Sequence, residues 1–190
     1  ELSNEKIKEK RTNNKLIVFV GRLDEEVKRV SRMINAIEYC KKNNLDVDFF
    51  IVGDGKEYDR LKEMVESHHL EKWEHLIGFQ ENPYPYIKNA DLFVCSSLNE
   101  GYNLAISEAV ILGVPVISTD CSGIKENLGN GKWGYIVENR KETLYHAISR
   151  CFDEPGFLEE LKKKSEAGSI QDTYEGRLKK IESIIEGVVN

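Results

Sequence analysis

The feature of this sequence that most restricts its fold is a repeated alternation between short apolar runs and longer segments with helical periodicity. The clearest apolar run is Leu16–Val20, which contains no polar residue and ends at Gly21, as is typical of a strand buried on both faces of a sheet. In the next segment, residues 27–43, apolar residues recur at every third or fourth position, which predicts an amphipathic helix. Strands and helices that alternate along a chain fold into a parallel sheet with helices on both faces.

The same two patterns continue along the rest of the chain. We expect strands at residues 16–20, 47–52, 75–77, 92–95, 114–118 and 135–137. We expect helices at residues 27–43, 58–65, 86–89, 103–112, 141–152, 155–167 and 173–188, and a loop with a short helix at residues 120–132. Pro83 and Pro85 are expected to interrupt the chain before the third helix. The pattern therefore predicts an α/β fold, a Rossmann-like open parallel sheet of about six strands with helices on both faces.

The chain divides into three parts of different composition. Residues 1–14 are a charged lead-in without an apolar pattern, residues 15–170 carry the alternating pattern of one domain, and residues 171–190 are expected to form a last helix. The full length of 190 residues is enough for one domain with a hydrophobic core and marginal for two.

Composition argues against several classes of function. Lys and Arg number 27 and Asp and Glu number 33, so the formal net charge is −6, and we expect no nucleic-acid partner, because such a partner needs a basic face. The sequence has no run of about 18 apolar residues and no signal-peptide pattern, so we expect neither a membrane-spanning helix nor secretion. The four cysteines are widely spaced, which predicts reduced thiols in a cytoplasmic protein, with two disulfides as the alternative.

The loop after the first expected strand is the first candidate binding segment, because ligands of open parallel sheets bind beyond the carboxyl ends of the strands. It has Arg22 at the strand end and Lys28 at the expected helix start. A guanidinium, an ammonium and the free N–H groups of a helix start together suit a diphosphate. The alternative is that both cations are solvated and pair with the neighbouring acids, which are Asp24, Glu25 and Glu26.

The loop after the fourth expected strand is the second candidate. Glu100 closes this loop, Gly101 permits close backbone approach, and Glu108 lies on the second turn of the following helix. Helix N–H groups attract phosphates and carboxylates accept hydrogen bonds from sugar hydroxyls, so the segment suits a ligand that has both. The alternative is that Glu100 is only a helix cap and Glu108 a surface acid, although its apolar neighbours Ile106 and Val110 favour burial or a ligand.

Three further patterns are weak. Residues 53–58 begin like a dinucleotide fingerprint but lack its third glycine, so we expect no nicotinamide cofactor. Asp46-Val47-Asp48 has the spacing of a metal-binding DxD motif, but it begins a strand at the wrong side of the sheet, so we expect it to be surface charge. The histidines lack metal-ligand spacing, and the sequence therefore predicts no metal site.

Taken together, these segments resemble the nucleotide-binding, C-terminal half of a GT-B glycosyltransferase of the family 4 type, within the group 1 glycosyl transferases. The resemblance extends from about residue 15 to residue 187, and it is specific because many motifs occur in the same order. The matching segments are Val20-Gly21-Arg22-Leu23 with Lys28, Ile51-Val52-Gly53-Asp54-Gly55, Leu76-Ile77-Gly78-Phe79, Asn89-Ala90-Asp91-Leu92-Phe93-Val94, Glu100-x7-Glu108-Ala109, Gly113-Val114-Pro115-Val116-Ile117 and Gly131-Lys132-Trp133-Gly134-Tyr135-Ile136-Val137.

The resemblance implies a role for each matching residue. Arg22 and Lys28 resemble the pair that holds the diphosphate of the donor, and Glu100 resembles the acid at the donor sugar, so these three are the expected catalytic residues. Glu108 resembles the acid that accepts hydrogen bonds from the ribose hydroxyls. The other expected binding residues, partly through their backbone groups, are Gly21, Gly78, Phe79, Gln80, Tyr102, Asn103 and Leu104.

The resemblance also implies the chemistry. The donor would be a nucleotide diphosphate sugar of the UDP or GDP type, the enzyme would need no metal or other cofactor, and the anomeric configuration would be retained. The sequence departs from the family pattern at three places. Asn103 and Arg29 stand where glycine is common, and Cys121-Ser122-Gly123 replaces the common glycine pair.

A GT-B enzyme has two domains, and this chain matches one of them. We therefore expect the N-terminal acceptor-binding domain to be missing, residues 171–190 to pack on that domain, and the isolated chain to transfer no sugar. For the full-length enzyme, the resemblance implies hexosyl transfer in cell-surface polysaccharide or glycolipid synthesis, in the cytoplasm or, through peripheral association, at the inner face of the membrane. Two alternatives are a non-catalytic nucleotide-binding module with the same fold and half of a related epimerase, whose catalytic histidines and acids are not found here in the required order.

Overall fold

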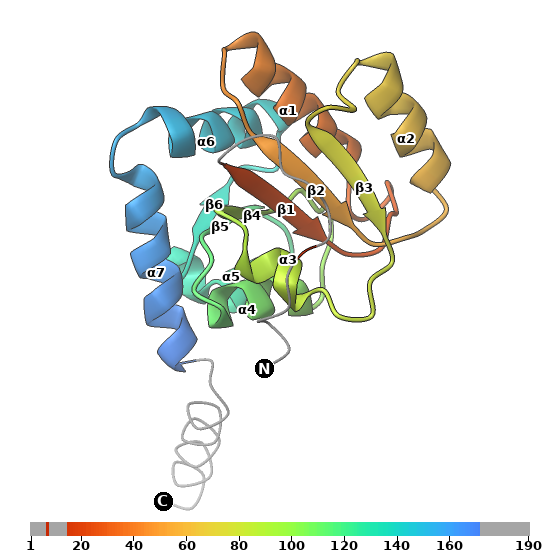
Figure 1. Ribbon diagram of the computed structural model, residues 1–190. Coiled ribbons are helices and arrows are strands. Elements are labelled where there is room, and N and C mark those ends of the chain that lie inside the picture. Colours follow the sequence, from red (N-terminus) through yellow and green to blue (C-terminus); the bar gives the residue numbers. More distant parts are fainter. Residues whose placement is uncertain (1–6, 8–14, 172–190) are drawn as a thin grey trace, which may run out of the picture.

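The computed structural model describes Ile7 and residues 15–171, and it confirms the α/β fold expected from the sequence. One sheet has six strands in the order β3-β2-β1-β4-β5-β6, and every neighbouring pair is parallel (Figure 1). The strands are β1 (Leu16–Val20), β2 (Asp48–Val52), β3 (Glu74–Gly78), β4 (Leu92–Cys95), β5 (Val116–Thr119) and β6 (Tyr135–Val137).

Helices cover both faces of this sheet (Figure 1). One face carries α1 (Ser31–Lys42), α2 (Tyr58–Ser67) and α6 (Lys141–Asp153). The other face carries α3 (Tyr84–Lys88), α4 (Leu104–Ile111), α5 (Ile124–Asn127) and the 3₁₀ helix Gly129–Gly131. The last described helix, α7 (Phe157–Gln171), contacts α4, α6 and β5 and so joins the two layers.

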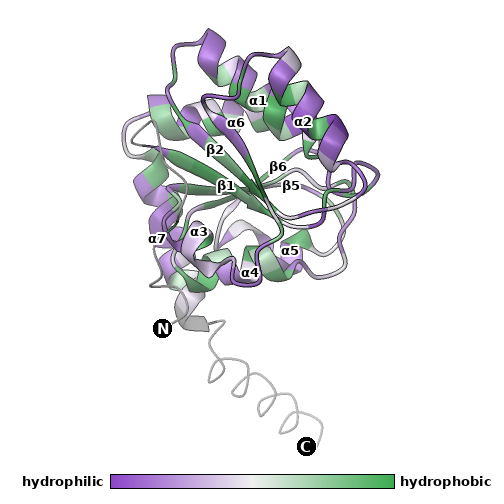
Figure 2. Cartoon of the chain, turned by 45° about the vertical axis from the view of Figure 1, so that its right-hand side comes forward, coloured by the Kyte–Doolittle hydropathy of each residue, from purple (hydrophilic) through white to green (hydrophobic). Residues whose placement is uncertain are grey.

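The central strand β1 shows why the apolar runs have no polar residues. Ile17 and Phe19 pack into the core under α1, whereas Leu16 and Val18 pack into the core under α4. Successive side chains of a strand point to opposite faces, and here both faces are covered. In Figure 2 the apolar strands accordingly lie between helices whose outer surfaces are hydrophilic.

The strand order reverses next to β1, and this fixes where a ligand can bind. From β1 the chain builds β2 and β3 on one side, and then crosses back to place β4 on the other side. The helices that follow β1 and β4, which are α1 and α4, therefore cover opposite faces of the sheet. Ligands of such sheets bind at this switch point, beyond the carboxyl ends of the strands, and we call that region the crevice.

Several expected boundaries were wrong, each for a local reason. Helix α1 begins at Ser31 rather than at residue 27, because Arg29 has a φ of 52°, in the left-handed region that a helix excludes. Strand β5 begins at Val116 rather than at residue 114, because the N–H of Val114 bonds to the carbonyl of Ala109 and closes α4. Helix α3 begins at Tyr84 and includes the second proline in its first turn, where a missing N–H is tolerated.

The expected helix at residues 173–188 lies outside the described residues. Among the described helices, none is long and apolar enough to cross a bilayer. All four cysteines are free thiols, and Cys40, Cys95 and Cys151 are buried. Burial raises the pKa of Cys40 and Cys151 to about 12, so these thiols stay protonated at neutral pH.

Candidate functional site

The loops after β1 and β4 are bonded to each other where they leave the sheet. The N–H of Leu98 donates to the carbonyl of Val27 at 2.7 Å. The hydroxyl of Ser96, a buried residue, shares its one proton between the carbonyl oxygens of Lys28 at 2.8 Å and Arg29 at 2.9 Å. These bonds join two loops that are about seventy residues apart in sequence into one unit at the switch point of the sheet.

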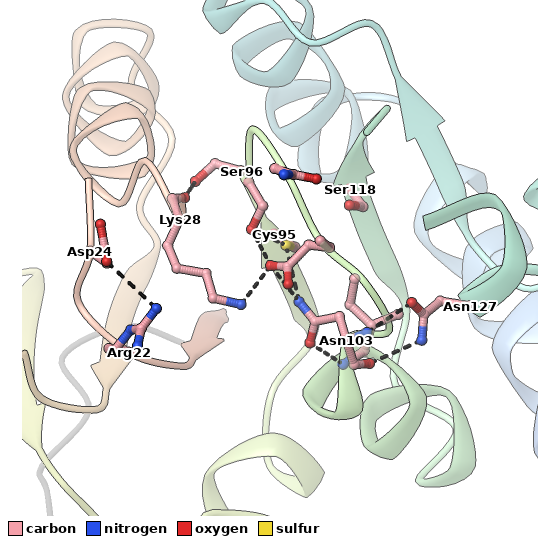
Figure 3. Close-up of polar contacts among 12 residues, drawn as sticks. Arg22, Asp24, Lys28, Cys95, Ser96, Asn103, Ser118 and Asn127 are labelled. Carbon is pink, nitrogen blue, oxygen red and sulfur yellow. Dashed lines mark hydrogen bonds and ion pairs between the residues drawn. The ribbon is translucent and has the colours of Figure 1, made fainter. Parts of the chain in front are cut away.

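This unit brings together Lys28 and Glu100, two of the expected catalytic residues. Nζ of Lys28 lies 2.5 Å from Oε1 of Glu100, and the two side chains are only 15% and 9% exposed. The same oxygen accepts hydrogen bonds from Oγ of Ser97 at 2.5 Å and from Nδ2 of Asn103 at 3.0 Å. Figure 3 shows the Lys28 side chain reaching from the first loop toward the segment that contains Cys95 and Asn103. Three donors on one oxygen hold the Glu100 carboxylate in a fixed position.

The start of α1 does not supply the free N–H groups that the sequence predicted. The N–H of Ser31 donates to Oε1 of Glu25 at 2.8 Å, and the hydroxyl of Ser31 donates to the other oxygen of this carboxylate. The next two N–H groups, of Arg32 and Met33, bond to carbonyls of the preceding turn. A carboxylate of the protein therefore occupies the helix end where a phosphate was expected.

Arg22 remains apart from Lys28 and Glu100. Its side chain is 70% exposed, and its guanidinium lies 3.6 Å from Oδ2 of Asp24. The expected alternative of pairing with a neighbouring acid is thus realised for Arg22, whereas Lys28 pairs with Glu100 instead. Figure 3 shows Arg22 on the same side of the crevice as Lys28.

The loop after β2 supports the Arg22 segment from behind. Gly53 has a φ of 145°, and a Cβ there would lie 1.9 Å from the carbonyl oxygen of Gly21. A Cβ at Gly55 would lie 2.4 Å from the carbonyl oxygen of Leu23, whose N–H bonds to the carbonyl of Asp54 at 2.9 Å. The two glycines that resembled a dinucleotide motif therefore serve close packing of two loops.

The start of α4 is the open helix end of the crevice. Asn103 is its N-cap, and its Oδ1 accepts the N–H of Ile106 at 3.3 Å. The N–H groups of Leu104 and Ala105 meet no acceptor within the described part of the chain. These two groups, with the partial positive charge of the helix end, can bind an anion.

A buried amide on α5 holds the cap residue in place. Asn127 is 2% exposed, its Oδ1 accepts the N–H of Asn103 at 3.0 Å, and its Nδ2 donates to the Asn103 carbonyl at 3.0 Å. Nδ2 also lies 3.0 Å from Oγ of Ser107 on α4. The backbone N–H of Asn103, which was expected to face the phosphates, is therefore already used inside the protein.

The loop after β5 packs directly against the tip that carries Glu100. Gly123 has a φ of 80°, and a Cβ there would lie 1.6 Å from the carbonyl oxygen of Gly101. The hydroxyl of Ser122 donates to the carbonyl of Glu100 at 2.9 Å and also bonds to the side chain of Asn99. Within the sequence that replaces the common glycine pair, Gly123 is thus required because a side chain there would clash, and Ser122 holds the tip through its hydroxyl.

Glu108 lies farther along α4 and contacts the neighbouring helix. Its Oε1 accepts a hydrogen bond at 3.3 Å from the hydroxyl of Tyr84, the first residue of α3. Burial raises the pKa of Glu108, and the hydrogen bond from Tyr84 acts against that rise. The negative charge of Glu108 in turn raises the pKa of Tyr84. Glu108 is therefore half-buried, as its apolar neighbours indicated.

The expected base-binding segment follows β3 on the rim of the crevice. Gly78 ends that strand with a φ of 77°, Phe79 is 73% exposed, and Nε2 of Gln80 lies 3.4 Å from the carbonyl of Ile77. The other large apolar side chains that are exposed on segments flanking the crevice are Leu98, Tyr102 and Leu104. Exposed rings and aliphatic groups of this kind can cover a planar base.

Within the described residues there is no group of three or more His, Cys, Asp or Glu side chains that could hold a metal ion.

The expectation that the DxD segment is surface charge holds for only one of its two acids. Asp46 is exposed and pairs with Lys41 at 2.5 Å, but Asp48 at the start of β2 is fully buried, so it is not surface charge. Its position at the amino end of the strand remains remote from the crevice.

Sequence reasoning missed three residues of this site. Ser97 is the second residue after β4, so its place close to a strand end was a usable signal. Asn127 and Tyr84 act across helix pairs, and nothing in the local sequence pattern indicates those contacts.

Comparisons with known proteins point to one family. The family model described as "Glycosyl transferases group 1" matches residues 2–168. MJ1059 of Methanocaldococcus jannaschii, named as an uncharacterized glycosyltransferase, is 33% identical over 125 residues, which are 64% of this chain and 30% of that protein. The N-acetylgalactosamine-N,N'-diacetylbacillosaminyl-diphospho-undecaprenol 4-alpha-N-acetylgalactosaminyltransferase of Campylobacter jejuni is 28% identical over 154 residues, 80% of this chain and 41% of its own length. The poly(ribitol-phosphate) alpha-N-acetylglucosaminyltransferase of Staphylococcus aureus is 32% identical over 124 residues, 64% of this chain and 25% of its own length.

Solved structures show the same fold. A pneumococcal O-GlcNAc transferase in complex with UDP and GlcNAc is 22% identical with a TM-score of 0.78, over 93% of this chain and 36% of that one. The Anabaena protein HepE in complex with UDP is 22% identical with a TM-score of 0.76, over 92% of this chain and 49% of that one. At this identity the likeness concerns the fold, which is that of GT-B glycosyltransferases. The chain thus spans less than half the length of these relatives.

Proposed function

The chain belongs to the group 1 glycosyl transferases, and on that premise we propose that it is the donor-binding half of a retaining hexosyltransferase. In this proposal the crevice binds a nucleotide diphosphate sugar of the UDP or GDP type, and an N-terminal domain of the whole enzyme binds the acceptor. The observation that carries the proposal is the buried ion pair of Lys28 and Glu100, at the switch point of the sheet and beside the open end of α4.

The diphosphate would lie between Lys28, Arg22 and the first turn of α4. An ammonium has three N–H donors, and Glu100 accepts one of those of Lys28, so others remain for phosphate oxygens. The exposed ion pair of Arg22 is worth little in water, and its guanidinium can exchange it for a bidentate phosphate contact. When the bond from the sugar carbon to the diphosphate breaks, negative charge develops on the leaving group, and fixed donors there lower the barrier.

The two carboxylates would act on the sugar and on the ribose. Glu100, fixed by three donors, would accept hydrogen bonds from the donor sugar and stabilise positive charge at its reacting carbon. Glu108 would accept hydrogen bonds from the ribose hydroxyls. Retention of the anomeric configuration is proposed from the resemblance to family 4 enzymes.

The relatives suggest the setting. The Campylobacter jejuni protein is named for a diphospho-undecaprenol-linked substrate and the Staphylococcus aureus protein for poly(ribitol-phosphate). We accordingly propose a role in cell-surface polysaccharide or glycolipid synthesis, without a metal, in the cytoplasm or at the inner face of the membrane. The donor-binding half by itself is expected to bind nucleotide and to transfer no sugar.

Calorimetric titration with UDP, GDP and ADP tests the proposal directly. We expect one of the three nucleotides to bind, and we expect Arg22→Ala and Glu108→Ala each to weaken that binding about tenfold, as loss of a charged hydrogen bond does. Arg150→Ala is the matched control, because this arginine is 42% exposed and pairs with Glu154, but at the last turn of α6, the end of that helix opposite to the loop after β6. Absence of binding by all three nucleotides, or equal weakening by the control, would contradict the proposal.

A turnover assay separates the enzyme from the alternative, a non-catalytic nucleotide-binding module. The same chain, joined to an acceptor-binding domain from a family relative, should transfer sugar, and Glu100→Gln should abolish transfer while nucleotide still binds. A fused protein that binds nucleotide and shows no transfer with any UDP- or GDP-sugar would favour the module.

A further inference from the structure

The contact between Tyr84 and Glu108 joins two helices across the edge of the crevice. Tyr84 is the first residue of α3 and Glu108 is the fifth residue of α4, and their side chains meet at 3.3 Å. The two helices pack against each other on the same face of the sheet (Figure 1). The contact is therefore a long-range feature of the fold and not a consequence of neighbouring positions on one helix.

The backbone around Tyr84 is restricted on both sides. Pro83 is the N-cap of α3 and Pro85 follows within the first turn, so the backbone angles on both sides are restricted. The N–H of Tyr84 donates to Oδ1 of Asn82 at 3.3 Å, which anchors the residue further. A fixed backbone at Tyr84 limits the positions that its hydroxyl can take and so favours the bond to the carboxylate.

We propose that Tyr84 is the positioning residue for Glu108: its hydroxyl holds Oε1 of the carboxylate so that Oε2 is presented to the hydroxyl groups of the donor ribose. This inference rests on the proposed function, in which Glu108 binds the ribose. It adds a residue outside the family motifs and assigns it an effect on ribose recognition through Glu108.

The electrostatics of the pair give this role a pH signature. The groups that shift Glu108 are burial, which raises its pKa, and the Tyr84 hydroxyl, which lowers it. On α3 and α4 no other titratable group among the described residues contributes to the Glu108 shift. Removal of the hydroxyl leaves only the effect of burial, so the pKa of Glu108 rises and the ionised acceptor is lost at a higher pH.

The test is a titration of Tyr84→Phe between pH 5 and pH 8. The ligand is the glucose ester of whichever nucleotide of UDP, GDP and ADP binds the wild type, because this diester has no phosphate ionisation near neutrality. We expect about threefold to tenfold weaker binding at pH 7, the loss of one hydrogen bond, and a fall in affinity that begins at a higher pH than in the wild type. Tyr58→Phe is the matched control. The hydroxyl of Tyr58 also donates one hydrogen bond, at 3.4 Å to the carbonyl of Leu76, but Tyr58 packs on the other face of the sheet.

A 2′,3′-dideoxy analogue of the same nucleotide separates positioning from simple packing. If Tyr84 acts through Glu108 on the ribose, removal of the ribose hydroxyls costs the wild type more affinity than it costs Tyr84→Phe, and the two changes are not additive. Additive effects, with an unchanged pH profile, would overturn the inference while the proposed function stands. If Glu108→Gln leaves nucleotide affinity unchanged, or no nucleotide binds the wild type, the proposed ribose contact fails and the inference fails with it.

Discussion

A carboxylate as enclosed as that of Glu100, which is 9% exposed, depends on its cation, because a buried charge without a partner is costly. We therefore expect Lys28→Met to lower the free energy of unfolding by about 3 kcal/mol in urea denaturation. The double variant Lys28→Met with Glu100→Gln should recover part of this loss, because it removes the unpaired charge as well.

Lys42→Met is the matched control for this prediction. Lys42 pairs with Glu38 at 2.8 Å, but its side chain is 69% exposed, so its loss should change stability by less than about 1 kcal/mol. Equal effects of the Lys28 and Lys42 substitutions would mean that the inner pair is screened by water like the outer one.

Arg29 shows a departure from the family pattern with a predictable energetic effect. Its φ of 52° lies in the left-handed region, where a side chain costs about 1–2 kcal/mol relative to glycine. We expect Arg29→Gly to raise the free energy of unfolding by about 1 kcal/mol, because relief of this strain exceeds the added freedom of the unfolded chain. Arg29→Ala keeps the Cβ and should change stability little; if both variants stabilise equally, charge rather than backbone strain is the cause.

At the scale of elements, the edge strand β3 begins with an acid on its buried side. Glu74 is 2% exposed, and within the described residues no hydrogen-bond partner contacts either carboxylate oxygen. Burial, with a smaller effect from Glu38, raises the pKa of Glu74 well above its usual value of 4.5. The folded state therefore keeps a proton that the unfolded state releases.

This predicts that stability falls as the pH rises. Above pH 4.5 the unfolded chain ionises at Glu74 while the folded chain does not, so the free energy of unfolding decreases until the folded group also ionises. Glu74→Leu should remove this dependence and stabilise the protein at pH 8 by about 1–3 kcal/mol, the penalty of an unpaired buried polar group. Glu74→Gln separates the effect of the charge from that of burying a polar group, because it keeps a polar side chain that cannot ionise. The measurement is urea unfolding of the wild type and both variants from pH 5 to pH 8. A Gln variant with the wild-type pH dependence would show that another group is responsible.

At the scale of the whole molecule, the order of elements could be predicted because it depends on patterns along the chain. Apolar runs such as Leu16–Val20 mark buried strands wherever both sheet faces are covered, and all six expected strands are found. The boundary of a helix is less predictable. A single backbone angle at Arg29 moves the start of α1 by four residues without any change in the periodicity of apolar residues.

The candidate site was predictable in its acids and cations and not in its supporting contacts. Lys28 and Glu100 were found because their loops follow strands that lie side by side in such a fold. The contacts of Asn127 and Tyr84 join helices that the sequence pattern does not pair, so they required the packed structure. The hydrogen bond from the N–H of Ser31, at the start of α1, to the Glu25 carboxylate likewise depends on a turn whose backbone could not be inferred from apolar spacing.

Because the crevice is formed by loops from the two halves of one sheet, a nucleotide that binds there should protect both loops from amide exchange at once. At a nucleotide concentration of 100 times Kd, linkage adds about 2.7 kcal/mol to the free energy of unfolding. Hydrogen–deuterium exchange should then slow most in the loop after β1 and at Leu104 and Ala105, whose N–H groups are open in the free chain. Amides in the last turn of α6 that exchange by local opening should not change, because this helix starts at the loop after β6 and its last turn is the end opposite to that loop. Protection centred instead on the groove between α2 and β3, which Tyr58 and Leu76 line, would place the nucleotide at the sheet edge and contradict the assignment of the switch point.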